Sequence, residues 1–179
     1  SNAAQEDEVS ARLRGYVDHW CVCVGWPDAR LAQQILEDGI DVLVDLSGHT
    51  GKNRLLTFAR KPAPVQVSYL GYAATTGLAA MDWRLTHAEV DPAGYEAYYS
   101  ERLYRLPGSL WCYRASAELG AVAAEPPCVG RGSVTFGSMN NLAKVSPDTV
   151  AVWAQMLRAL RGSMLLMTGI PEGSVRERL

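Results

Sequence analysis

The sequence predicts an α/β protein with mostly parallel sheets, and two observations carry that prediction. Short apolar runs alternate with segments of helical periodicity along most of the chain, as in proteins made of β–α–β units. The run Ile40–Leu46 is apolar at nearly every position, which is typical of a buried parallel strand. Hydrophobic residues make up 48% of the 179 positions, which is enough for a sizeable core.

Before residue 115 the expected elements follow one another closely. The polar residues 4–14 are expected to form a frayed or helical lead-in, and Trp20–Gly25 to form a strand or approach one. Asp28 is expected to cap a helix over Ala29–Glu37 that Gly39 ends. The other expectations are short helical segments at Arg54–Arg60 and Tyr95–Arg102, and strands at Ile40–Leu46, Val65–Leu70, Asp82–Thr86 and Leu103–Leu106.

Composition suggests where the chain divides. Residues 115–132 are dominated by Ala, Gly and Pro without a clear period, so we interpret them as a linker. The linker separates a first lobe, 4–114, from a second lobe, 133–179. Residues 1–3 (Ser-Asn-Ala) are interpreted as the remnant of an expression tag.

The second lobe is expected to be short. Strands are predicted at 133–136 and 164–168 around a helix at 147–161, and the charged start of another helix follows. Two strands and one full helix do not cover their own sheet, so we expect this lobe to be truncated. An uncovered apolar sheet favours association, which makes a homo-oligomer one expected state.

Charge and hydropathy exclude several classes of partner. The net charge of −2 and the absence of a basic run interleaved with aromatics argue against nucleic acid. No apolar run approaches the ~18 residues of a membrane span, and no signal peptide is visible. We therefore expect a cytoplasmic protein that does not associate with membranes.

The cysteines point to a reducing compartment. Cys21, Cys23, Cys112 and Cys128 lack CxxC spacing and are expected to be buried, reduced thiols, with Cys21 and Cys23 on one strand face. The three histidines are widely scattered, so the sequence predicts no metal site.

The stretch Ser133–Pro147 has the pattern of an anion-binding corner. A short apolar strand breaks at Gly137, a polar loop follows, and a helix begins with Ser146 as N-cap and Pro147 at the first helical position. Asp148 adds the negative charge that is common in a first helical turn. The free N–H groups and the positive dipole end of a helix attract anions.

Polar side chains in this loop extend the prediction. Lys144 adds a full positive charge just ahead of the helix, and Asn140 and Asn141 offer amides to a base, a ribose or a phosphate. An ordinary loop with a solvated lysine gives the same pattern, and no GxGxxG or Walker-type loop is present. The residues alone leave both interpretations open.

Three segments resemble one known family, the SPINDLY-like protein O-GlcNAc transferases (glycosyltransferase family 41). The start of the family's C-terminal catalytic lobe is similar to FGSMNNLAKVSPDTVAVWAQML. The later part of its N-terminal lobe is similar to Asp38–His87, and the connection that follows is similar to PGSLWCYR at Pro107–Arg114. Ala143 is typical of bacterial-type members. The superhelical repeats that the family carries upstream are absent here.

The resemblance implies a GT-B type fold, in which this chain covers the later N-terminal lobe and the start of the C-terminal lobe. It implies transfer of N-acetylglucosamine from UDP-GlcNAc to Ser or Thr hydroxyls of proteins, without a cofactor or metal. It also implies that Lys144 contacts the donor phosphates and is needed for activity, and that Asn140 and Asn141 lie in the donor-binding loop. The isolated piece is expected to be inactive, because the family's cleft needs two complete lobes.

Two further loops follow predicted parallel strands, where ligands bind in open sheets. Gly48, His49 and Thr50 follow the first strand, and we expect them to line the cleft. A structural turn is the alternative for His49. Asp45 is expected to be a satisfied turn acceptor. Lys52 and Arg54 either bind diphosphate or form a solvated edge or a pairing at a helix start. The second loop supplies the other residues expected to line the cleft, Leu70, Gly71 and Tyr72.

Two departures from the family pattern keep alternatives open. Ala73-Ala74 stands where Pro-Gly is expected, and His87 stands where an aspartate is usual. A degenerate, non-catalytic binding scaffold therefore remains one alternative, although the retained Lys144 argues against it. A related transferase that uses GDP-fucose or UDP-glucose is another.

Overall fold

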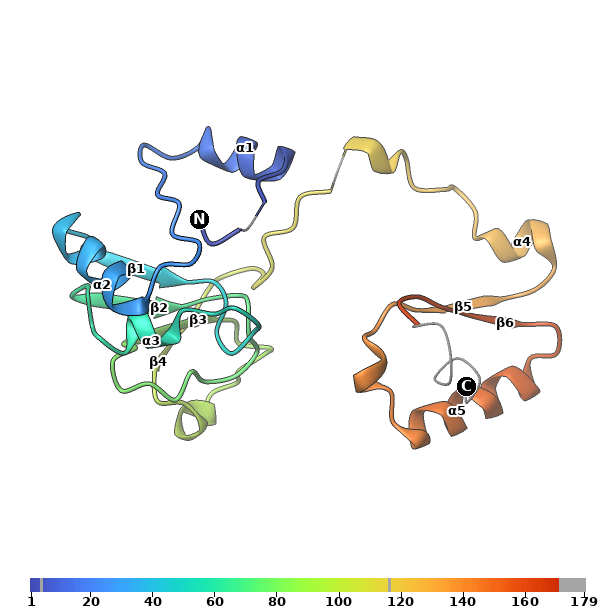
Figure 1. Ribbon diagram of the computed structural model, residues 1–179. Helices are drawn as coiled ribbons and strands as arrows, with labels where there is room; N and C mark the ends of the chain where they lie inside the picture. The colour runs from blue at the N-terminus through green and yellow to red at the C-terminus, as the bar shows by residue number, and fades with distance from the viewer. Residues whose placement is uncertain (4, 116, 171–179) are drawn as a thin grey trace. The chain divides into compact units, whose positions relative to one another are not determined.

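The computed structural model describes residues 1–3, 5–115 and 117–170 of the chain. The chain divides into two compact units, Ser1–Arg114 and Ala115–Leu179, called unit 1 and unit 2 below (Figure 1). Each unit combines parallel strands with helices, which confirms the predicted α/β class.

Unit 1 is organised around a four-stranded sheet in which all neighbouring strands are parallel. The register places Asp45 opposite Ser68, so the loops that follow the first two strands leave the sheet side by side. Each strand predicted between residues 40 and 106 is present. In spatial order the strands are β1 (Val42–Asp45), β2 (Val65–Ser68), β3 (Trp83–Thr86) and β4 (Arg102–Arg105).

The helices of unit 1 are short, and one of them starts differently from the prediction. Asp28 does not cap the second helix: its carboxylate instead accepts a 2.8 Å hydrogen bond from the hydroxyl of Thr57, and Pro27 takes the N-cap position. A tertiary partner thus replaces the local cap. The helices are α1 (Glu8–Arg14), α2 (Asp28–Glu37), α3 (Leu55–Phe58) and the 3-10 helix η1 (Tyr95–Tyr98).

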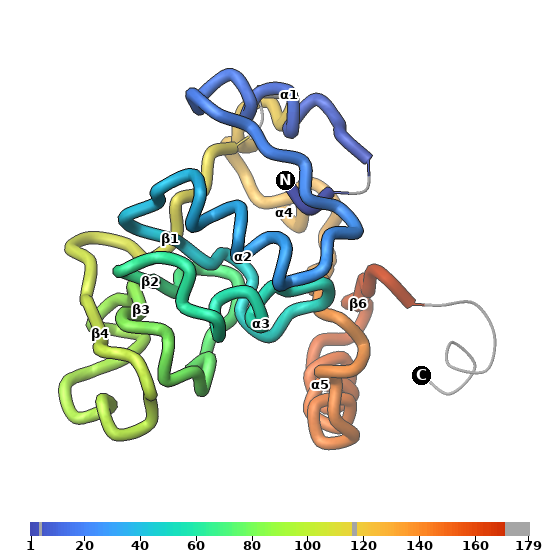
Figure 2. The backbone as a smooth tube through the Cα atoms, turned by 60° about the vertical axis from the view of Figure 1, so that its left-hand side comes forward, coloured from blue at the N-terminus to red at the C-terminus, as the bar shows by residue number. Residues whose placement is uncertain are grey.

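One face of the sheet carries the core of unit 1. Leu55, Phe58 and Met81 are buried together there, with Leu43 and Leu78 packed against them. Helices α2 and α3 lie on the same side of the strands (Figure 2). Side chains of the opposite face are more open to solvent.

That opposite face carries Val42 and Val44, which are 54% and 45% exposed. The guanidinium of Arg102 lies over the ring of Trp83 at 4.1 Å, and Tyr104 meets that ring edge-on. The sequence predicted strands buried on both faces, and this is wrong for β1 because its helices cover one side alone.

A polar cluster is buried beside the core. Tyr99 donates a 2.6 Å hydrogen bond to the carboxylate of Asp91, which also accepts one from the hydroxyl of Thr86. Burial and the hydrogen bond to Asp91 raise the pKa of Tyr99 to about 12. His87 keeps the adjoining turn, because its ring nitrogen Nδ1 accepts the N–H of Glu89 at 3.3 Å.

The segment Trp20–Gly25 is not a strand, contrary to one of the two expectations for it. Consequently Cys21 and Cys23 do not share a strand face, and Cys23 alone of the two is buried. Cys112 is exposed, so the prediction of buried thiols is wrong for it as well. All four cysteines are free, and the described residues hold no cluster of three or more potential metal ligands.

Residues interpreted as a tag remnant contact the rest of unit 1. The carbonyl of Ser1 accepts the N–H of Cys23 at 2.8 Å, and the side-chain oxygen of Asn2 accepts a 2.7 Å hydrogen bond from Arg54. Across the part of the chain that the structure describes, every helix is too short or too polar to cross a membrane.

Unit 2 holds a two-stranded parallel sheet and one long helix. The predicted break at Gly137 is wrong, because Gly137 lies inside the first strand, opposite Leu166. Residues 115–132, interpreted as a linker, contain two short helices. The elements are η2 (Ala117–Leu119), α4 (Pro127–Arg131), β5 (Thr135–Ser138), η3 (Leu142–Lys144), α5 (Pro147–Ala159) and β6 (Met164–Met167).

The start of α5 follows the prediction. Ser146 is the N-cap, and its side chain accepts the N–H of Thr149 at 3.2 Å. Pro147 occupies the first helical position and Asp148 lies in the first turn. The helix predicted after residue 168 falls largely on 171–179, outside the described residues.

Candidate functional site

The predicted corner in unit 2 lies at the carboxyl end of β5. Its loop runs from Met139 to Val145 and includes the single turn η3. Lys144 ends that turn, exposed and without an ion pair in the described part of the chain. The Lys144 charge is therefore available to a ligand.

Asn141 has a structural task in this loop. Its side-chain oxygen caps η3 by accepting the N–H of Ala143 at 3.0 Å. That bond orients the side chain and leaves its amide N–H₂ as a donor. Asn140 is exposed beside it and forms no hydrogen bond that competes with a ligand among the described residues. Two amide donors and one ammonium group thus gather within five residues.

The helix end behind the loop adds a partial positive charge. Ser146 satisfies the N–H of Thr149, and Pro147 has no N–H, which leaves Asp148 with the backbone donor nearest the loop. The carboxylate of Asp148 offsets part of the dipole, so Lys144 is the main attraction for an anion. Ser138, at the end of β5, is 7% exposed, and its hydroxyl has no hydrogen-bond partner.

Two loops of unit 1 interlock at the carboxyl ends of β1 and β2. Gly48 has a φ of +52°, and a Cβ there would lie 2.3 Å from the Cβ of Tyr72. A Cβ on Gly71 would lie 1.9 Å from the carbonyl oxygen of Leu46. Only glycine allows so close an approach. Leu70 has a φ of 63°, a conformation that costs free energy in a non-glycine residue and recurs at functional loops.

His49 joins the two loops through its ring. Nε2 lies 2.9 Å from the carbonyl oxygen of Thr76, and the ring meets Tyr72 edge-on at 5.2 Å. The structure therefore brings Gly48 and His49 of the first loop together with Gly71 and Tyr72 of the second, while Thr50 and Leu70 adjoin them in the chain. Their role in binding stays a prediction.

The neighbouring charged residues have local roles. The Asp45 carboxylate accepts the N–H groups of Ser47 and Gly48 at 3.0 and 2.8 Å, which confirms its prediction as a turn acceptor. Arg54 donates to the carbonyl oxygens of Trp26 and Cys23 and pairs with Asp28 at 3.5 Å. Arg54 thus pairs locally, and the exposed Lys52 is the cation of this loop without such partners.

Sequence reasoning missed the residues that hold the second loop. Glu101 and Arg84 are 4% and 2% exposed, and both bind backbone groups of the loop between β2 and β3. The available signal in the sequence is a charged residue within one strand, Arg84 in β3, and another just before the next strand, Glu101 before β4. Periodicity shows that such a residue is out of place but does not identify its partner.

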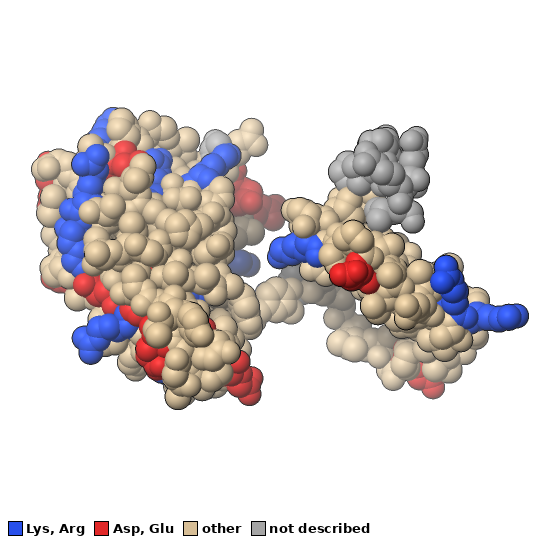
Figure 3. Space-filling model, turned by 90° about the horizontal axis from the view of Figure 1, so that it is seen from below, with Lys and Arg blue, Asp and Glu red and all other residues tan. Residues whose placement is uncertain are grey.

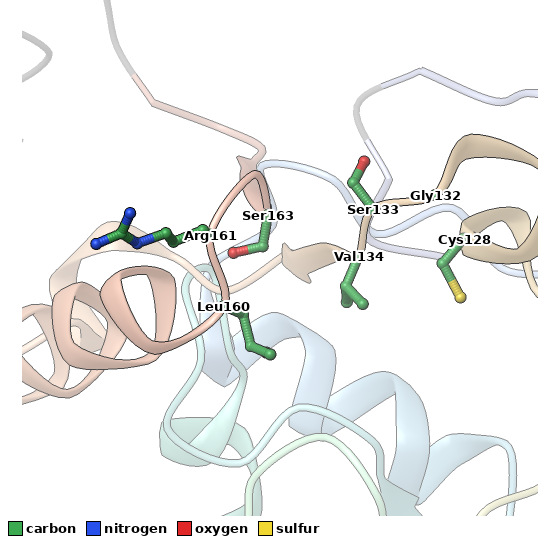
Figure 4. Close-up of a pocket in the computed structure, with 7 residues that line it drawn as sticks. All are labelled: Cys128, Gly132, Ser133, Val134, Leu160, Arg161 and Ser163. Atoms are coloured by element: carbon green, nitrogen blue, oxygen red, sulfur yellow. The ribbon is translucent and has the colours of Figure 1, made fainter.

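A hollow of about 320 Å³ lies at the other end of the unit 2 sheet (Figure 4). It is lined by Val134 and Leu160 together with polar residues, and the side chain of Arg161 points away from it. It lies before β5 and not after it, so it is separate from the Lys144 loop. On the face shown in Figure 3, Lys and Arg form a narrow stripe along one edge of unit 1, whereas those of unit 2 lie apart from one another.

The family model for glycosyl transferase family 41 matches residues 7–114, which is almost all of unit 1. The chain therefore belongs to glycosyl transferase family 41. This confirms the family expected from the three sequence segments.

Curated relatives extend the likeness into unit 2. The probable UDP-N-acetylglucosamine–peptide N-acetylglucosaminyltransferase SPINDLY of Solanum lycopersicum is 44% identical over 161 residues, 89% of this chain and 17% of the relative. The protein named SEC from Arabidopsis thaliana, with the same probable activity, is 29% identical over 188 residues, 99% of this chain and 19% of the relative. The chain thus spans less than a fifth of these relatives.

A solved structure gives the same answer for the fold. A mutant of the O-GlcNAc transferase from Thermobaculum terrenum has a TM-score of 0.88 and 36% sequence identity to this chain. The match covers 99% of this chain and 34% of that one. Since that enzyme is a GT-B glycosyltransferase, the predicted GT-B type is confirmed.

Proposed function

We propose that the protein transfers N-acetylglucosamine from UDP-N-acetylglucosamine to Ser or Thr hydroxyls of proteins. The names of the relatives support this proposal, because they state that donor and a peptide acceptor. The observation that carries it in this chain is the loop between β5 and α5, where the unpaired Lys144 stands before a capped helix N-terminus.

The chemistry of this loop suits a nucleoside diphosphate. When the sugar leaves, negative charge grows on the diphosphate, and a fixed cation and helix N–H group stabilise it. We assign the phosphate contact to Lys144, and contacts to base, ribose or phosphate to Asn140 and the free amide of Asn141. At the start of the same loop, the buried hydroxyl of Ser138 has no hydrogen-bond partner. Such an unsatisfied hydroxyl costs free energy.

For unit 1 we propose that the interlocked loops contact substrate. Gly48, His49 and Thr50 follow β1, while Leu70, Gly71 and Tyr72 follow β2. Their location at the carboxyl ends of parallel strands supports this assignment, because ligands of open α/β sheets bind there. We also place the protein in the cytoplasm, which its four free cysteines support.

Calorimetric titration of UDP and of GDP into the 179-residue chain tests the donor assignment. We expect saturable UDP binding, weaker GDP binding, and about a tenfold or greater loss of UDP affinity in Lys144→Ala, as for loss of a hydrogen bond to a charged group. Arg161→Ala is the matched control, since it removes an exposed cation of unit 2 away from the loop. It should bind UDP as the wild type does.

Each departure from this pattern has a distinct meaning. Equal losses in Lys144→Ala and Arg161→Ala would indicate attraction by net charge and contradict a specific phosphate contact. Tighter binding of GDP than of UDP would favour a donor such as GDP-fucose. No binding of either nucleotide to the wild-type chain would overturn the assignment of this loop as the donor site.

A further inference from the structure

The loop between β2 and β3 joins two parallel strands without a helix. A helix satisfies its own backbone hydrogen bonds, whereas a buried loop needs partners from elsewhere. Thr76 in this loop is buried, and the carbonyl oxygen of Ala74, two residues earlier, accepts a 3.0 Å hydrogen bond from Arg84.

Glu101 is the main anchor of this loop. It precedes β4 and is 4% exposed. Its carboxylate accepts hydrogen bonds from the Thr76 backbone N–H at 2.7 Å, from the Thr75 hydroxyl at 2.6 Å, and from the Thr76 hydroxyl. Three donors on two consecutive residues converge on one buried carboxylate, so loop and carboxylate fix each other.

The same residue also reaches His49, through its carbonyl group. The carbonyl oxygen of Thr76 lies 2.9 Å from His49 Nε2. A carbonyl oxygen only accepts hydrogen bonds, so the proton of the neutral imidazole must be on Nε2. Nδ1 then carries the lone pair, and none of the described residues forms a hydrogen bond with it.

We propose that Glu101 is a positioning residue: by anchoring Thr76 it holds His49 in the Nε2–H tautomer, with Nδ1 free to accept a hydrogen bond from a substrate hydroxyl. The identity of that hydroxyl, a Ser or Thr of the acceptor protein, rests on the proposed function. The anchoring of His49 does not.

The ionisation of Glu101 agrees with this arrangement. Burial alone would raise its pKa, but the hydrogen bonds from Thr75 and Thr76 outweigh burial and lower the pKa below the usual value. A lowered pKa means that the carboxylate, and with it the anchor, is present at neutral pH. The anchor is lost as the pH falls through that lowered pKa.

The test is NMR of the 179-residue chain, reading the His49 ring nitrogens and amide hydrogen exchange in wild type, Glu101→Ala and Glu101→Gln. In Glu101→Ala we expect exchange at the Thr76 amide to accelerate about tenfold or more, as the bond to a charged acceptor is lost. The His49 Nε2 proton should lose its protected signal and the second tautomer should appear. Exchange at Val67, in β2, should stay unchanged.

Glu101→Gln should restore both signals, because its amide oxygen can accept from Thr76 and its N–H₂ can donate to the Thr75 hydroxyl. Glu89→Ala is the matched control: it removes an exposed glutamate of the same unit and should change neither signal. A purely structural role for Glu101 would accelerate exchange at Val67 as much as at Thr76. That outcome, or unchanged signals in Glu101→Ala, would overturn the proposal.

If Glu101→Ala does not fold, acid titration of the wild type against Glu101→Gln provides the answer. The Thr76 amide signal should change in wild type as Glu101 is protonated, and stay constant in Glu101→Gln. Absence of this change in the wild type would contradict the proposal. These signals arise in unit 1, so they are independent of nucleotide binding at Lys144.

Discussion

In unit 1, Leu55, Phe58 and Met81 are buried with a layer of polar and charged side chains, whereas among the described residues of unit 2 only Ser138 reaches the same degree of burial. Both units place loops at the carboxyl ends of parallel strands. Unit 1 holds its loops by tertiary contacts, through Glu101, Arg84 and the close approach at Gly71. Unit 2 holds its loop by local caps at Asn141 and Ser146.

The difference shows two ways to position polar side chains. Tertiary anchors remain as rigid as the core beneath them, while local caps depend on a helix that is marginal without tertiary packing. We therefore expect unit 2 to open before unit 1.

Met81→Ala should produce the largest loss. Met81 is 2% exposed in the core of unit 1, and truncating such a side chain costs about 2–5 kcal/mol. Urea unfolding followed by amide NMR signals of each unit should show a lower midpoint for unit 1. Val152→Ala, at a position 61% exposed on α5, is the comparison. It should change the free energy of unfolding of unit 2 by about 0.5 kcal/mol or less. Equal effects would mean that unit 1 has no distinct core.

Gly71→Ala should lower the free energy of unfolding of unit 1 by about 1–3 kcal/mol, because a Cβ would meet the Leu46 backbone. The same unfolding experiment measures it, and the His49 ring signals should shift as the loops separate. Gly51→Ala is the matched control in the same region, where a Cβ meets no atom within 4 Å and φ is not positive. If Gly71→Ala were as stable as the wild type, the two loops would not be interlocked.

Ser146→Ala should cost about 1 kcal/mol, the usual value of a helix N-cap. The loss should be confined to unit 2, seen as faster hydrogen exchange in the first turn of α5 with unchanged exchange in β2. Ser133→Ala, before β5 and outside any cap, is the control. Faster exchange in both units would contradict their separate stabilisation.

At alkaline pH a further effect should appear in unit 1. The pKa of Tyr99 is raised to about 12, so the folded state holds the phenol proton more tightly than the unfolded chain, where the pKa is about 10. This contribution is fully present below about pH 10 and is lost as the pH rises towards the folded value. The urea midpoint of unit 1 should be measured between about pH 9 and 12, which brackets the ordinary tyrosine pKa. It should fall more with rising pH for wild type than for Tyr99→Phe. Tyr113→Phe, at an exposed position, should behave as wild type.

Local sequence determined the elements and the corner of unit 2. Apolar runs identified all four strands of unit 1, and the order Ser146, Pro147, Asp148 located the start of α5, because caps act over one turn of chain. The strand expected at Trp20–Gly25 does not form, because a strand also needs a neighbouring strand, which periodicity does not reveal. For the same reason the break expected at Gly137 is wrong: pairing with β6 keeps Gly137 inside β5.

Only the tertiary structure decided the partners of the charged residues. The sequence placed His49 and Tyr72 in two loops, but the contact between Thr76 and Glu101 joins residues 25 positions apart. Asp28 was expected to cap its own helix and instead meets Thr57 of α3. Such bonds form where folding brings a donor and an acceptor together away from water. A charged residue in a strand therefore shows from sequence alone that a partner is needed, and the fold determines which partner it is.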